Sequence, residues 1–314
     1  MLSAYRAAGA TLPFGDPRGY HGAGMEGHYW RFTHAASRRV VIVILAISRD
    51  RDGAAWSMVS LATHPEGRVV SATVPKAAAA ARGLSVRAGD VLAATARGLD
   101  VRLDGAELHV AFEQPQLWPR RTFGALGLAG AVPGLSQYWH PWLLGGRARG
   151  VLALDGREHL LDGATAYAEK NWGAGGMPPA WWWGQADAFG DGDACVAFAG
   201  GHAGMGRLRV PAGAVVARVG DVVRTVARPP QALRIDVGAA GWRLRGGGIE
   251  IDGEAGGAQP LLLPVPVPRE RRRIDARAPQ LLAGTLRLRV TRGRRLIFAG
   301  ESPLAGLEQG RGAP

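Results

Sequence analysis

The chain has 314 residues, 47% of them hydrophobic, a mean hydropathy of -0.02 and a formal net charge of +12. This composition excludes a disordered chain, and the longest apolar run, Val40–Ile47, is far shorter than the ~20 residues of a membrane-spanning helix. The arginines are spread along the chain and their densest runs lack interleaved aromatic residues, so we expect no nucleic-acid partner. Peripheral contact with an anionic membrane fits the charge at least as well.

The expected compartment follows from the N-terminus and from cysteine usage. The first residues contain no extended apolar core followed by a small-residue cleavage site, so a secretory signal is not expected. A single cysteine, Cys195, excludes an internal disulfide bond. Both features predict a cytoplasmic protein.

The chain is divided into short segments by 47 glycines and 20 prolines, and Asp-Gly pairs recur at Asp52, Asp104, Asp155, Asp162, Asp191 and Asp252. Such pairs are typical of tight hairpin turns. Between the turns lie β-rich or alternating segments, which we expect to be strands: Val40–Ser48, Trp56–Thr63, Glu107–Glu113, Gly150–Leu154, Ala194–Ala199, Arg207–Val210, Ala214–Val219, Leu233–Val237, Trp242–Arg245 and Leu286–Val290. Only Pro75–Gly83 is helix-like. The pattern predicts an all-β fold built from antiparallel barrels or sandwiches.

Two segments resemble each other in the two halves of the chain. Glu26 to Phe32 follows a glycine-rich loop and precedes a strong strand, and Glu169 to Trp172 precedes a tryptophan-rich strand. This similarity suggests a duplicated β-barrel unit, with domains at residues 1–165 and 166–314.

Two proline-containing segments do not fit central strands. Pro115–Gly146 is rich in glycine, proline and aromatic residues, and we interpret it as a loop that crosses or caps the mouth of a barrel. Pro264–Pro268 is expected to be an extended edge or connector, since proline cannot donate a hydrogen bond to a central strand pairing.

The densest chemistry lies in Ala166–Asp187, which contains Glu169, Lys170, Asn171 and four tryptophans. If residues 181–187 form a strand, one face carries Trp181, Trp183, Gln185 and Asp187. The same rule places Glu26, His28, Trp30 and Phe32 together on another strand. Indoles followed by an amide and a carboxylate suit an enclosed site for a large apolar ligand with one polar end.

Simpler explanations exist for each of these residues. Tryptophans commonly pack in cores, His28 and His140 are more often structural than catalytic, and Glu169 with Lys170 could form a solvated ion pair. Signatures of common hydrolases, nucleotide enzymes and zinc enzymes are missing from the sequence, so we expect no metal and no cofactor. What remains is chemistry that needs a proton and a shaped apolar pocket.

The block Tyr167-Ala-Glu169-Lys170-Asn171-Trp172-Gly173, followed by Pro178-x-x-Trp181-Trp182-Trp183-x-Gln185, resembles the tocopherol cyclase family. Met25-Glu26-Gly27-His28-Tyr29-Trp30 is similar to the opening motif of that family, with His28 in place of an aromatic residue. Met177 and Asp187 also depart from the family pattern, which leaves the substrate open. The resemblance implies two consecutive lipocalin-like, calycin-type antiparallel β-barrels and an apolar isoprenoid substrate, a prenylated hydroquinone that is closed to a chromanol.

Ring closure needs a protonated acid, and burial can keep a carboxyl group protonated. Glu169 and Glu26 are the first candidates and Asp187 the third. If Lys170, beside Glu169 in the sequence, holds that carboxyl group ionised, Glu169 and Lys170 are structural or orient the hydroquinone, and Glu26 or Asp187 is the acid. The candidate catalytic residues are Glu26, Glu169, Asp187, Lys170 and Asn171. The candidate substrate-binding residues are Trp30, His28, His140, Trp172, Trp181, Trp183 and Gln185. Besides a cyclase, an isoprenoid hydratase and a non-catalytic isoprenoid carrier remain open.

Overall fold

The structure is a computed structural model that describes residues 5, 10, 18–50, 53–80, 82–119, 122–173, 180–190, 192–205, 208–238, 241–266, 274 and 276–311. Some positions discussed above lie outside these residues: Asp52, Met177, Pro178, Asp191, Arg207 and Pro268.

Strands make up nearly all of the regular structure, as the turn-rich sequence predicts. The first part of the chain supplies β1 (Met25–His34), β2 (Arg39–Arg49), β3 (Ala55–His64), β4 (Val69–Val74), β5 (Ala78–Ala79), β6 (Ser85–Ala88), β7 (Leu92–Thr95), β8 (Gly98–Leu103), β9 (Ala106–Glu113), β10 (Tyr138–Leu154), β11 (Arg157–Leu160) and β12 (Ala164–Gly173). The second part supplies β13 (Ala180–Ala186), β14 (Ala194–Met205), β15 (Leu208–Val219), β16 (Val222–Arg228), β17 (Arg234–Gly238), β18 (Gly241–Gly246), β19 (Ile249–Glu254), β20 (Leu261–Val265), β21 (Ala276–Arg292) and β22 (Arg295–Arg311). A short 3-10 helix, η1 (Gly127–Ala131), precedes β10. Within the described ranges, the molecule has no helix of the length and apolarity needed to cross a membrane.

The strands form two antiparallel sheets with the same plan. The 12-stranded sheet has the order β4-β3-β2-β1-β12-β10-β9-β8-β7-β6-β5, with β11 paired to β10. The 10-stranded sheet has the order β16-β15-β14-β13-β22-β21-β19-β18-β17, with β20 paired to β21. In each sheet a four-stranded meander is joined to the rest through its first strand, by β1 to β12 and by β13 to β22. The predicted all-β fold of two consecutive lipocalin-like units is confirmed.

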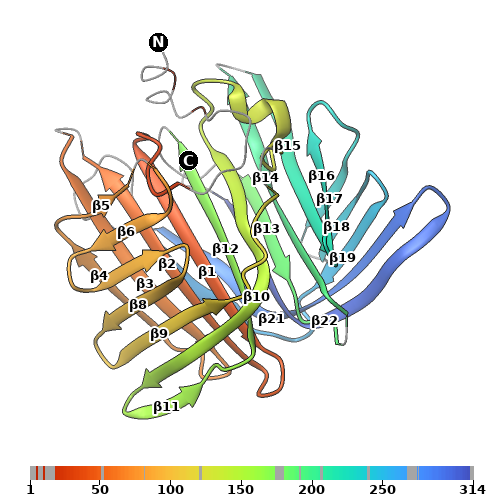
Figure 1. Cartoon of the computed structure of the whole chain (residues 1–314). Coiled ribbons are helices and arrows are strands. Elements are labelled where there is room, and N and C mark those ends of the chain that lie inside the picture. The colour runs from red at the N-terminus through yellow and green to blue at the C-terminus, as the bar shows by residue number, and fades with distance from the viewer. Residues whose placement is uncertain are drawn as a thin grey trace.

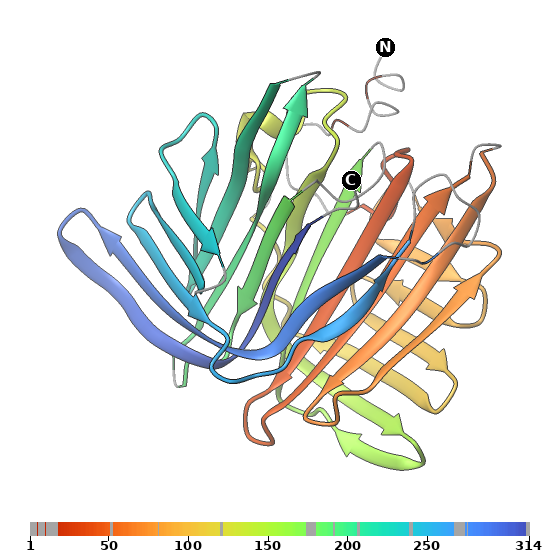
Figure 2. The ribbon, with the colours of Figure 1, turned by 180° about the vertical axis from the view of Figure 1, so that it is seen from behind.

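Figures 1 and 2 show the two curved sheets side by side, the first in red to yellow-green and the second in green to blue. Among the described residues each hydrogen-bonded path ends at strands that are consecutive in the chain, β4 and β5 or β16 and β17. Each unit is therefore an open barrel.

Burial along a strand depends on whether the outer face of the strand packs against the other sheet. In β2, Val41 and Val43 pack inside the first unit, whereas Val40 packs against Leu263 of β20 in the second. β9 and β19 lie away from this contact, and their residues alternate between buried and exposed. Burial on both faces explains why Val40–Ile47 is an unbroken apolar run.

Two buried arginines join the sheets where strand pairing is irregular. Arg31 of β1 donates to the carbonyl oxygens of Leu282 (2.8 Å) and Leu304 (2.5 Å), beside the register shifts between β21 and β22. In the opposite direction, Arg218 of β15 donates to the carbonyl oxygen of Leu144 (2.8 Å), beside a register shift between β10 and β12. Each irregularity frees carbonyl groups, and an arginine from the other sheet satisfies them.

The helix expected at Pro75–Gly83 is wrong. Ala78–Ala79 form strand β5 and pair with Arg87 and Val86 of β6. The helix propensity of the alanines is a fraction of a kcal/mol per residue, so pairing at the sheet edge outweighs it. The Asp-Gly pair at Asp252 also lies inside a strand, β19, and not in a turn.

The proposed equivalence of the Glu26 and Glu169 segments is also wrong. They belong to neighbouring strands of one sheet, where Glu26 lies opposite Trp172 and His28 opposite Lys170. By strand order, the counterpart of β1 in the second unit is β13. The sheets divide in the chain between Gly173 and Ala180, whereas residue 165 lies within β12; two separate folding domains stay a prediction.

Candidate active site

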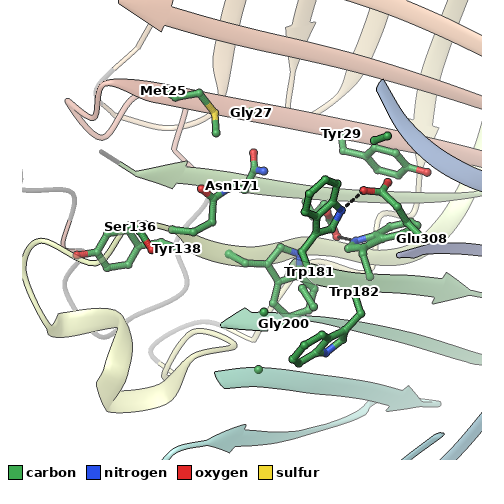
Figure 3. A pocket seen from close by; sticks show the side chains of 18 of the residues that line it. Met25, Gly27, Tyr29, Ser136, Tyr138, Asn171, Trp181, Trp182, Gly200 and Glu308 are labelled. Atoms are coloured by element: carbon green, nitrogen blue, oxygen red, sulfur yellow. Dashed lines mark hydrogen bonds between the residues drawn. The ribbon is translucent and has the colours of Figure 1, made fainter. Parts of the chain in front are cut away.

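A cavity of about 510 Å³ lies between the two sheets (Figure 3). Its apolar lining includes Met25 of β1, Ile44 of β2, Met58 of β3 and Leu263 of β20. Residues of the 126–139 segment, including η1, close one side. The sequence predicts Pro115–Gly146 as a loop at the mouth of a barrel; in the structure part of it closes the cavity between the sheets, and residues 138–146 belong to β10.

Three consecutive tryptophans of β13 reach the cavity because a glycine in a neighbouring strand makes room for each ring. A Cβ atom added to these glycines would lie 1.9 to 3.0 Å from the nearest indole atom. Trp183 packs with Tyr167 of the first sheet, Trp181 shares its face of β13 by alternation, and Trp182 packs in the core of the second unit. The pairs are Trp181 with Gly310, Trp182 with Gly200 and Trp183 with Gly306.

Two carboxyl groups face this cavity, one from each sheet. Glu169 of β12 accepts hydrogen bonds from the Tyr167 hydroxyl (2.5 Å) and from Trp183 Nε1 (2.9 Å). Glu308 of β22 accepts a hydrogen bond from Trp181 Nε1, as the dashed line in Figure 3 marks. The tryptophans of β13 therefore hold both acids in place.

Burial raises the pKa of both carboxyl groups. For Glu169, hydrogen bonds from Tyr167 and Trp183 hold back part of that rise. For Glu308, burial and the negative charge of Glu169 raise the pKa to about 7, against the hydrogen bond from Trp181. A carboxylic acid that keeps its proton near neutral pH can serve as a general acid.

Uncharged polar groups stand beside the two acids. Gln280 of β21 lies directly opposite Glu308, and its Oε1 has no hydrogen-bond partner among the described residues. The Tyr29 ring packs edge-on against Trp183, with 5.0 Å between ring centroids. Asn171 lines the cavity opposite Gly27, where a Cβ atom would lie 1.9 Å from the amide oxygen of Asn171. These groups can orient the polar end of a ligand.

Lys170 points away from the cavity, because successive side chains of a strand alternate between faces. Its ammonium group forms a buried ion pair with Glu26 inside the first unit and donates to the carbonyl oxygen of Gly19 (2.8 Å). Burial would raise the pKa of Glu26, but hydrogen bonding from His21 and the charge of Lys170 lower it to about 2. Glu26 is therefore ionised, and Lys170 is held by Glu26 and not by Glu169.

The other predicted residues divide between the cavity and its surroundings. His28 of β1 is among the residues that line the cavity, and its Nε2 donates a hydrogen bond to the Gly19 carbonyl oxygen (3.1 Å). Trp30 lies in the core of the first unit, and Trp172 stacks on His21 with 3.9 Å between ring centroids. His140 packs edge-on against Trp118.

Gln185 of β13 and Asp187, which directly follows the end of β13, are outside the cavity lining. Gln185 Nε2 donates to Asp187 Oδ2 (3.1 Å) beneath the tryptophans. Burial raises the pKa of Asp187, and the positive charge of Arg31 opposes that rise. Of the twelve predicted site residues, the cavity is lined by Glu169, Asn171, Trp181, Trp183 and His28.

Sequence reasoning missed Glu308 and Gln280. A signal for Glu308 was present, because Gly306, Glu308 and Gly310 alternate and so place a carboxylate between two glycines on one face of a strand. For Gln280 we find no comparable signal. Within the described part of the chain, no group of three or more His, Cys, Asp or Glu side chains is placed to hold a metal ion.

The fold and the cavity define a class of protein: two lipocalin-like β-units that enclose an apolar, acid-bearing space between their sheets. The sequence profile described as "Tocopherol cyclase-like" matches residues 115–311. The chain belongs to the tocopherol cyclase-like family. Both Glu169 and Glu308 lie within the matched residues.

Individual relatives agree over shorter stretches. The chain is 34% identical over 116 residues to a probable chloroplastic tocopherol cyclase of Oryza sativa subsp. japonica, covering 32% of this chain and 24% of the relative. It is 33% identical over 102 residues to the chloroplastic tocopherol cyclase of Zea mays, covering 28% of this chain and 21% of the relative. The chain thus matches less than a quarter of the length of either relative.

A solved structure extends the likeness in fold to the whole chain. Kievitone hydratase from Nectria haematococca aligns with a TM-score of 0.53 at 12% identity, over 98% of this chain and 95% of that chain. At this identity the likeness concerns the fold alone.

Proposed function

We propose that this protein is an enzyme that closes a prenylated hydroquinone, or a related isoprenoid, to a chromanol-type ring by protonating an alkene. The observation that carries the proposal is the convergence of two carboxyl groups with raised pKa and two indoles on one apolar cavity. Membership of the tocopherol cyclase-like family supports the same reaction.

The residues around the cavity suit each step of this reaction. A protonated carboxyl group delivers its proton to the less substituted carbon of the alkene, which leaves a tertiary cation on the other carbon. The indole faces of Trp181 and Trp183 stabilise a nearby cation by ~0.5–2 kcal/mol each. The phenol oxygen then bonds to the cationic carbon and its proton returns to the carboxyl groups, so the product is an isomer of the substrate.

The position of the acids sets the orientation of the substrate in this proposal. The alkene that reacts is the one nearest the aromatic ring, so the ring lies beside Glu169, Glu308 and Gln280. The prenyl chain extends toward the end of the cavity where Figure 3 places Met25 and Tyr138. Asn171 lies between the two ends, where its amide contacts either the ring hydroxyl or the first part of the chain.

We also infer how such an apolar substrate reaches the cavity. The capping segment exposes Phe123 (50%) and Leu128 (66%), and Val132 of the same segment lines the cavity. Together with the net charge of +12, these side chains suit contact with an anionic lipid surface. The cytoplasmic location stays a prediction.

The test is turnover by the purified protein in the presence of a chelator and without added nucleotide. We expect a prenylated hydroquinone to be converted to a chromanol of the same mass, and a heat-denatured sample to leave it unchanged. A product heavier by one water, carrying heavy oxygen from labelled water, would indicate a hydratase. A ligand that quenches tryptophan fluorescence but is recovered unchanged would indicate a carrier.

A further inference from the structure

The two carboxyl groups of the cavity are not equivalent. Glu169 and Glu308 come from different sheets, and each is bound by a different indole of β13, Trp183 for Glu169 and Trp181 for Glu308. Two carboxylates in one apolar space repel each other, so one of them retains a proton. The surroundings decide which one.

We propose that Glu308 is the proton donor and that Glu169 stays ionised as the counter-charge of the cation. This assignment rests on the proposed cyclisation. It gives different roles to two residues of the same type, one of which no sequence motif identified.

Hydrogen-bond donors favour ionisation of Glu169. Its Oε2 accepts from both the Tyr167 hydroxyl and the indole nitrogen of Trp183, and hydrogen bonds to a carboxylate stabilise its charged form. Among the residues that the structure describes, the carboxyl group of Glu308 accepts from one side chain, Trp181, through Oε1. Glu308 has fewer donors, so its carboxylate loses less hydrogen-bond stabilisation when it is protonated.

Access to the cavity favours Glu308 as the donor. Both carboxyl groups line the cavity, but Glu169 is only 7% exposed, whereas Glu308 is half-buried. Gly306 and Gly310 flank Glu308 on its own face of β22, so no side chain of that strand separates the carboxyl group from a ligand.

The electrostatic interaction between the two carboxyl groups agrees with this geometry. The negative charge of Glu169 contributes to the raised pKa of Glu308, which is about 7. Because the two groups interact, the pair titrates together, and the proton stays on the less stabilised member.

In the proposed step the O–H bond of Glu308 breaks as a C–H bond forms at the alkene, which leaves Glu308 ionised. The tertiary cation is then trapped by the phenol oxygen, and a C–O bond forms. The phenolic O–H bond breaks and its proton returns to Glu308, which restores the starting state. No electron acceptor or donor is needed.

The test compares Glu308→Gln with Glu169→Gln, and uses Glu301→Gln as the control. Glu301 lies on the same strand but is exposed and paired with Arg287. We expect Glu308→Gln to lower kcat by ~100-fold or more and Glu301→Gln to leave it unchanged. Glu169→Gln should retain part of the activity and shift the alkaline limb of the pH–rate profile to lower pH, because removing a negative charge lowers the pKa of Glu308.

The reverse pattern would overturn the assignment: an inactive Glu169→Gln together with an active Glu308→Gln whose pH profile is shifted. Full activity in both variants would overturn it as well. If both variants are inactive, titration of tryptophan fluorescence decides, because Trp181 reports on Glu308 and Trp183 on Glu169. A transition near pH 7 that disappears in Glu308→Gln supports the proposal, and one that disappears only in Glu169→Gln contradicts it.

Failure of the proposed cyclisation would be seen separately. If the wild-type protein converts no prenylated hydroquinone, the proposed function fails. The fluorescence titration needs no substrate, so it still tests whether Glu308 holds the proton.

Discussion

Glycine residues allow the indoles of β13 to lie against neighbouring strands. Trp181 rests on Gly310, and from that position its ring nitrogen reaches Glu308. The aromatic cluster and the acid are therefore packed together, and the position of Trp181 depends on the glycine at position 310.

This packing predicts the effect of Gly310→Ala. The added Cβ would lie 1.9 Å from the Trp181 ring, so the indole must move away from Glu308. We expect a loss of ~1–3 kcal/mol in the free energy of unfolding and a lower cyclisation rate. Gly238→Ala is the control, because no atom lies within 4 Å of a Cβ there. Equal chemical denaturation curves and rates for the two variants would contradict the packing argument.

The Lys170–Glu26 ion pair should matter for folding and not for ligand binding. Lys170→Met leaves a buried carboxylate without its cation, which we expect to cost ~3–5 kcal/mol in urea denaturation. Lys76→Met, at an exposed position, should cost nothing measurable. Folded Lys170→Met should bind a prenylated hydroquinone as the wild type does, because Lys170 faces away from the cavity; weaker binding would contradict that placement.

At the scale of strands, Arg31 and Arg218 make the two sheets depend on each other. Arg31→Leu would leave the Leu282 and Leu304 carbonyl groups without this donor, and we expect it to cost ~2–4 kcal/mol of unfolding free energy. Arg243→Leu, which removes an exposed ion pair with Asp252 at 3.6 Å, should cost ~1 kcal/mol or less. Similar denaturation midpoints for both variants would exclude a structural role for the cross-sheet arginine.

Strand positions could be predicted from sequence where turns and apolar alternation are local signals. Val40–Ser48 lies within β2, and the Asp-Gly pairs at Asp104 and Asp155 form hairpin turns with glycine φ angles of 69° and 80°. Pairing between distant strands leaves no such local signal. The neighbouring positions of β1 and β12 were therefore mistaken for a repeat.

At the scale of the whole molecule, the space between the sheets is both a core and the candidate site. The cluster around Trp183 and Tyr167 and the cluster around Ile42 and Leu304 each contain residues of both sheets. A strand such as β2 would expose one apolar face if the second sheet were absent.

This shared core predicts a single cooperative thermal transition. Unfolding one sheet would expose buried apolar side chains of the other, so calorimetry should record one peak whose van't Hoff and calorimetric enthalpies agree. Two resolved peaks would indicate that the sheets unfold independently, as separate domains would.

The candidate site could be predicted only in part, because the arrangement of the two sheets decides which residues reach the cavity. The sequence placed Glu169, Trp181 and Trp183 together because they lie close in the chain and alternate along strands. It could not exclude Glu26, and the alternation of Gly306, Glu308 and Gly310 does not show that Glu308 borders the same cavity, because both places depend on which face of which sheet borders it. The ionisation of each acid follows from that placement.

The most direct measurement is the fate of a solvent proton during turnover. In deuterated water, we predict that a prenylated hydroquinone yields a chromanol with one deuterium on the former alkene carbon that does not bear the ring oxygen. We also predict that Glu308→Gln forms this product far more slowly. A chromanol without deuterium, or a ligand that occupies the cavity and is released unchanged, would contradict proton-initiated ring closure between the two sheets.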